Sequence, residues 1–234
     1  ASAPSRQIRV RPPDAEYELW FASSNGALQS IRSLNSGEVL SAGSLNDSLW
    51  RLTFLDETTL PSLRANEFSI ESTTHRFSFD EESTQLIYEY DEDGRRLTLA
   101  IDIIGLDAQR FDLKASITND TGFAIRTVSL PEQLAFDLDG LQRVLFPIQE
   151  GLTLLPQFFT EGRATMMARP PLFADVLAYE GARGDLSIHM IQDSRYQSEM
   201  VLHHPTDAPV FQPNNLGTGG IGDQGYFQLD MVTY

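Results

Sequence analysis

Residues 86–103 read LIYEYDEDGRRLTLAIDI, two apolar runs with a short charged segment between them. Apolar and polar residues alternate along Leu97–Ile103, which is typical of a β-strand with one face in a hydrophobic core. The charged segment ends in Asp93-Gly94, and Asp-Gly favours the tight turn of a β-hairpin. The stretch therefore predicts two antiparallel strands joined by a hairpin, with the acidic residues as solvated turn charges.

Similar strand and turn signals continue on both sides of this hairpin. Asn25-Gly26 and Asn35-Ser36-Gly37 separate three short apolar runs, and Asn119–Gly122 closes a further alternating strand. The best helix candidate, Glu132–Leu141, is cut short by a proline before it and a glycine within it. Short strands at intervals of about 8–12 residues are typical of sandwiches and barrels, so we expect an all-β fold.

The length of 234 residues, of which 41% are hydrophobic, suits one large β domain with a substantial core. Residues 1–14 are polar and rich in proline, which predicts an extended leader before a single β-sandwich domain at 15–234. The irregular stretches 146–172 and 203–225 are expected to contact a neighbouring domain. The chain stops at Tyr234 within a strand pattern, which is expected of a domain cut from a longer chain.

The charge and residue composition narrow the classes of partner. With 17 basic and 33 acidic residues the net charge is −16, which disfavours nucleic acid and membrane surfaces but not a neutral sugar. The chain has no cysteine, so disulfides, thiolate metal sites and a cysteine nucleophile are excluded. The small residues 1–5 are compatible with signal-peptide cleavage, so a secreted or periplasmic location is expected and a cytoplasmic one stays open.

Four segments, taken in order, carry a family resemblance: Ser24–Ile31 with Asn35–Glu38, Ala115–Gly122, Val144–Pro147 with Gly151 and Pro156, and Arg169–Asp193. The chain is similar to the galactose mutarotase-like fold, and more narrowly to the N-terminal β-sandwich that precedes a (β/α)8 barrel in bacterial glycoside hydrolases. The resemblance implies a large two-sheet antiparallel supersandwich whose partner is the neighbouring catalytic domain of the same chain.

No residue pattern identifies catalytic chemistry in this chain. A glycosidase needs two suitably spaced carboxylates, and no local motif singles out a pair among the 33 acidic residues. A mutarotase would need an acid and a base beside the sugar, but its Asn-His-x-Tyr-Phe-Asn strand is absent. The four histidines do not form a recognised metal-ligand spacing. We therefore predict no catalytic residue, no metal site and no cofactor.

Carbohydrate binding is the functional class that the residues favour. The segment Asp193–Gln197 combines a carboxylate, a guanidinium, an aromatic ring and an amide, which are groups that bind sugar hydroxyls and C–H faces. Trp20 and Trp50 lie in strand patterns and are expected in the core. The predicted carbohydrate-binding residues are Asp193, Arg195, Tyr196 and Gln197, with His189 on the preceding strand and Arg169 in the matching segment.

The expected function is that of a non-catalytic domain that supports or rims the catalytic domain of a glycoside hydrolase and binds carbohydrate. Two alternatives stay open. The chain would be an aldose epimerase or mutarotase-like enzyme if a concave pocket held a histidine and a carboxylate. It would be an independent carbohydrate-binding module if it bound glycans without a catalytic neighbour.

Overall fold

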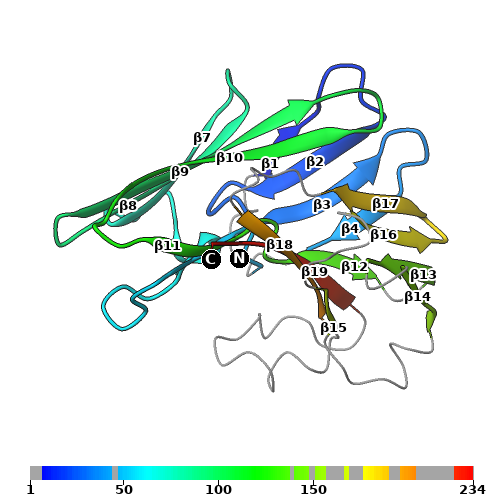
Figure 1. Cartoon of the computed structure of the whole chain (residues 1–234). Helices are drawn as coiled ribbons and strands as arrows, with labels where there is room; N and C mark the ends of the chain where they lie inside the picture. Colours follow the sequence, from blue (N-terminus) through cyan, green and yellow to red (C-terminus); the bar gives the residue numbers. More distant parts are fainter. Residues whose placement is uncertain are drawn as a thin grey trace, which may run out of the picture.

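The computed structural model is an all-β fold built from antiparallel sheets, as the turn spacing predicts (Figure 1). It describes residues 7–43, 47–137, 140–147, 151–156, 166–168, 176–189, 196–203 and 224–233. Among the described residues the strands pair into four hydrogen-bonded sheets, whereas the family resemblance implies two. Within these ranges no helix is long and apolar enough to cross a membrane.

The first sheet includes part of the predicted leader. Its first strand lies within residues 1–14 and pairs with the second, from Gln7 opposite Ala22 to Val10 opposite Leu19. The predicted Asn25-Gly26 turn is confirmed, because it connects the second strand to the third. The order is β1 (Gln7–Val10), β2 (Tyr17–Ala22), β3 (Leu28–Ser33) and β4 (Val39–Ala42).

The second sheet contains the hairpin at residues 86–103. Asp93 and Gly94 form its two-residue turn with φ of 53° and 75°, so both have the positive φ that a type I′ turn requires. Leu97, Leu99 and Ile101 are at most 1% exposed, so their side of the strand faces the core. The order is β10 (Phe111–Asp120), β9 (Arg95–Gly105), β8 (Gln85–Glu92) and β7 (His75–Asp80).

The third sheet joins strands from distant parts of the chain. The last strand, β19 (Gln224–Thr233), lies between β18 (Tyr196–His203) and β11 (Ile125–Ser129). It also pairs with β12 (Leu134–Asp137), which occupies part of the segment considered as a helix. The short 3-10 helix η1 (Ala65–Glu67) follows β6. The order is β15 (Met166–Ala168), β18 (Tyr196–His203), β19 (Gln224–Thr233), β11 (Ile125–Ser129), β5 (Arg51–Phe54) and β6 (Leu63–Arg64), with β12 (Leu134–Asp137) beside β19.

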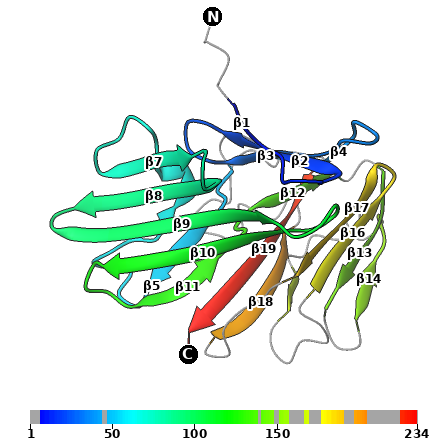
Figure 2. The same cartoon turned by 90° about the horizontal axis from the view of Figure 1, so that it is seen from above.

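The fourth sheet lies at the end of the molecule opposite β7–β10, as Figure 2 shows. One hairpin of this sheet consists of β16 (Val176–Gly181) and β17 (Gly184–His189), joined by a turn at Ala182 and Arg183. The order is β14 (Leu152–Leu154), β13 (Leu141–Phe146), β16 (Val176–Gly181) and β17 (Gly184–His189).

One hydrophobic core connects these sheets, and Trp50 lies within it. Its side chain is 0% exposed, and its ring centroid lies 5.3 Å from that of Phe68 and 5.1 Å from that of Tyr88. The prediction that Trp50 is a core residue is therefore confirmed. The same prediction for Trp20 is wrong, because Trp20 is half-buried on the outer face of the first sheet, beside two arginines.

Candidate functional site

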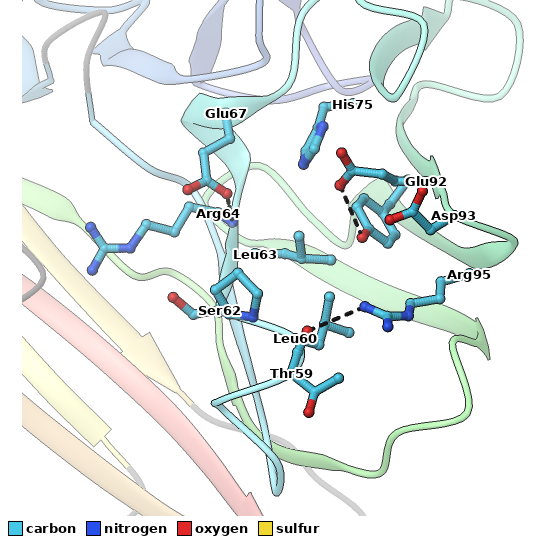
Figure 3. A pocket seen from close by; sticks show the side chains of 12 residues that line it. Thr59, Leu60, Ser62, Leu63, Arg64, Glu67, His75, Glu92, Asp93 and Arg95 are labelled. Atoms are coloured by element: carbon cyan, nitrogen blue, oxygen red, sulfur yellow. Dashed lines mark hydrogen bonds between the residues drawn. The ribbon is translucent and has the colours of Figure 1, made fainter.

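A pocket of about 590 Å³ lies between the segment that carries β6 and the tip of the β8–β9 hairpin (Figure 3). The wall combines apolar side chains with an imidazole, a phenol, carboxylates and a guanidinium. We call it the His75 pocket, and its lining residues are Thr59, Leu60, Pro61, Ser62, Leu63, Arg64, Glu67, His75, Tyr90, Glu92, Asp93 and Arg95.

His75 is the first residue of β7 and is held by neighbours on three sides. It pairs in register with Tyr90 of β8, and the two ring centroids are 5.1 Å apart. Its ring also lies edge-on to Phe68 at 5.2 Å, and its Nδ1 is 3.1 Å from Oγ1 of Thr74. Figure 3 shows the imidazole and the Glu92 side chain pointing into the same space. His75 is thus positioned by packing and remains half-buried at the pocket.

Tyr90 and Glu92 form the adjoining wall. The Tyr90 hydroxyl donates a hydrogen bond to Oε2 of Glu92 at 3.3 Å. Burial, and then the negative charge of Glu92, raises the pKa of Tyr90 above its ordinary value. The phenol therefore stays protonated at neutral pH and continues to donate, while the exposed Glu92 keeps acceptor capacity for a ligand.

Arg95 connects the hairpin to the opposite side of the pocket. Its Nη1 donates to the carbonyl oxygen of Thr59 at 3.2 Å, and its Cζ lies 5.2 Å from the ring centroid of Phe123. These contacts use only part of a guanidinium with five N–H donors. Arg95 can therefore hold the loop in place and still offer donors to a ligand.

The rear wall of the pocket is anchored by a buried ion cluster. Arg64 lines the pocket, but its guanidinium points away from the other side chains drawn in Figure 3. Its Nη2 lies 3.2 Å from Oε1 of Glu132, which is 0% exposed, and Nε of Arg51 lies 3.5 Å from the same oxygen. Arg51 and Arg64 are paired across β5 and β6, so one carboxylate holds both strands.

The predicted sugar-binding residues lie elsewhere or outside the described residues. His189 is exposed at the end of β17 opposite Val176 and does not line the His75 pocket. Tyr196 and Gln197 are the first two residues of β18, and the structure describes their backbone pairing. Asp193, Arg195 and Arg169 lie outside the described residues. This predicted site stays a prediction.

The sequence interpretation missed the pocket because it treated the hairpin tip as solvated charge. Glu92 and Asp93 are indeed exposed, but they stand at the rim of a cavity whose other side comes from residues 59–67. One signal was present: His75 begins a strand pattern immediately before the hairpin. No local motif connects it with Glu67 or Arg95, since strand pairing brings these side chains to one pocket.

The comparisons with known proteins do not assign a site to this chain. A scan against protein-family models finds no match, and a search of curated proteins finds no significantly similar sequence. The chemistry of the pocket therefore rests on its own groups. The carboxylates accept hydrogen bonds, the Arg95 guanidinium donates them, and the imidazole can do either, beside the exposed apolar ring of Pro61.

Proposed function

We propose that this chain is a non-catalytic, carbohydrate-binding β domain of a carbohydrate-active enzyme and that it binds sugar in the His75 pocket. The observation that carries the proposal is the combination of charged, polar and apolar groups around one cavity of about 590 Å³. That volume lies within the range of about 300–1,000 Å³ that is usual for small-molecule sites.

The groups of the pocket suit a polyhydroxylated ligand. Sugar hydroxyls can donate to Glu67, Glu92 and Asp93 and accept from Arg95, and hydrogen bonds to charged groups are the stronger ones. The apolar C–H face of a sugar ring can pack against Pro61, which is exposed at the pocket. The excess of acids over bases in the wall makes a neutral sugar a better ligand than an anionic one.

The proposal also assigns the chain an architecture and a partner. The four sheets would build the galactose mutarotase-like supersandwich that the sequence resembles, in a secreted or periplasmic glycoside hydrolase. Exposed apolar side chains on the fourth sheet and just after it support a neighbouring catalytic domain of the same chain as the partner. Leu145, Leu152 and Leu155 are 37%, 38% and 53% exposed.

Isothermal titration calorimetry against a panel of neutral oligosaccharides tests the site. We expect Arg95→Gln to weaken sugar binding at least about tenfold, because it removes charge-assisted hydrogen bonds. Arg96→Gln is the matched control. Arg96 is the next residue in the chain, its side chain is 73% exposed, and it pairs with Asp91 at 3.2 Å. Unchanged affinity in Arg95→Gln, or loss of binding in Arg195→Gln instead, would place the site outside this pocket.

A second candidate function is favoured by the presence of His75 together with carboxylates in one pocket. That is the arrangement an aldose epimerase would need for its acid and base. Polarimetry on freshly dissolved α-glucose and α-galactose provides the measurement. If the chain is an epimerase, we expect it to accelerate mutarotation and the His75→Ala variant to lose this acceleration. Equal rates with and without the wild-type chain would exclude this function.

A further inference from the structure

The outer face of the first sheet carries a second cluster of charged and aromatic side chains, which come from other parts of the sequence than the His75 pocket. Arg9 of β1 lies opposite Trp20 of β2, and Arg32 of β3 lies opposite Glu18 of β2. Between these positions Leu19 is 0% exposed, so the alternating side chains of β2 divide into a core face and an outer face. We call the outer group Arg9, Glu18, Trp20 and Arg32 the arginine–tryptophan face.

Both carboxylate oxygens of Glu18 accept hydrogen bonds within this face. Its Oε1 accepts the indole N–H of Trp20 at 2.7 Å, and its Oε2 accepts Nε–H of Arg9 at 2.5 Å. Glu18 is 6% exposed, so the indole and one guanidinium are fixed around a nearly buried carboxylate. Glu18 therefore balances the charge of Arg9 and orients the ring of Trp20.

Arg32 carries a positive charge that Glu18 does not balance. Its Cζ lies 4.7 Å from the ring centroid of Trp20, closer than the 5.7 Å of Arg9. Its Nε donates to Oγ of Ser30 at 3.3 Å, and it forms no ion pair with a carboxylate of the described residues. Two guanidinium groups thus share one ring and one carboxylate, which leaves one positive charge in excess.

A guanidinium stacked on an aromatic ring is prepared to bind an anion. The ring fixes the guanidinium plane and leaves its in-plane N–H donors at the edge, where a carboxylate can accept two parallel hydrogen bonds. Ser30 takes a single donor, on Nε, so the terminal nitrogens of Arg32 are available for such a pair.

We propose that the arginine–tryptophan face binds the carboxylate of an acidic sugar, with Arg32 as its receptor. The carboxylate follows from the geometry of Arg32, and the sugar class rests on the proposed function. A single carboxylate suits the face better than a polyanion, because the chain as a whole carries a net charge of −16. The arginine–tryptophan face would then bind acidic sugars and the His75 pocket neutral ones.

Tryptophan fluorescence provides the test, because Trp50 is 0% exposed and the other tryptophan, Trp20, lies on the face. We expect glucuronate to change the emission of the full chain saturably, and glucose at equal concentration to leave it unchanged. Trp20→Phe should remove the signal. Arg32→Gln should weaken glucuronate binding at least about tenfold, measured by calorimetry as well.

Arg110→Gln is the control, since Arg110 is an exposed arginine that already pairs with Asp107 at 2.6 Å. Equal glucuronate affinity in Arg32→Gln and wild type would overturn the proposal, and acetate binding as tightly as glucuronate would overturn its sugar class. Neutral-sugar binding measured with Arg95→Gln separates the two sites. If no neutral sugar binds but glucuronate binding depends on Arg32, the His75 pocket fails and this face stands.

Discussion

Replacing Glu132 with alanine is expected to lower the free energy of unfolding by about 3–5 kcal/mol. The carboxylate is 0% exposed and lies between the guanidinium groups of Arg51 and Arg64, which are 12% and 11% exposed. Its removal takes away the anion that two nearly buried cations share, and breaking a buried ion pair by removing one partner is strongly destabilising. Because β5 and β6 pair through these arginines, the rear wall of the His75 pocket should loosen as well.

Urea denaturation followed by circular dichroism measures this loss, together with a fall of about 2–4 °C in Tm per kcal/mol. Glu180→Ala is the control, since Glu180 pairs with Arg143 at 2.6 Å on the surface and should cost at most about 1 kcal/mol. A triple variant, Arg51→Met with Arg64→Met and Glu132→Leu, should recover much of the stability by removing all three charges. Similar losses for Glu132→Ala and Glu180→Ala would contradict the role of the cluster.

Gly26→Ala is expected to cost about 2–4 kcal/mol, more than a turn glycine usually does. Gly26 has φ of 71°, which disfavours any residue with a Cβ. An added Cβ would also collide with the Tyr88 hydroxyl and lie 2.7 Å from Cε2 of Phe77. Tyr88 and Phe77 are 0% and 2% exposed, so neither ring has room to move aside.

Gly37→Ala separates the two causes. Gly37 has nearly the same φ, 73°, but an added Cβ there meets no atom within 4 Å. It should therefore show only the backbone cost, of about 1–2 kcal/mol. Thermal and urea unfolding of both variants provide the comparison. If the two substitutions lose equal stability, the contact with Tyr88 is not what requires glycine at position 26.

Most turns could be predicted because their preferences are local. Gly26, Gly37, Gly94 and Gly122 all have φ between 71° and 82°, as expected where Asn-Gly, Ser-Gly, Asp-Gly and Thr-Gly interrupt apolar runs. At Gly122 the preceding Asn119 supports the turn, since its Oδ1 accepts the N–H of Thr121 at 3.1 Å. These interactions span only a few residues and need no distant partner.

The candidate sites could not be predicted in the same way. His75 meets Tyr90 because of the register between β7 and β8, and Arg64 meets Glu132 although the two are far apart in sequence. Register depends on which side chains the core buries, and that depends on all the sheets together. The acidic hairpin tip was therefore interpreted by its composition, without the cavity beside it.

The alternation of short strands and tight turns follows from the amino-acid sequence alone, because period-two hydrophobicity and positive-φ residues act locally. How the described strands divide into four sheets, and which face of each meets the core, depends on contacts between distant parts of the chain. Trp20 and Trp50 illustrate the difference, since both lie in similar apolar runs. Trp50 packs against Phe68 and Tyr88, whereas Trp20 lies beneath two arginines on the outer face, because alternation specifies two faces but not which one is buried.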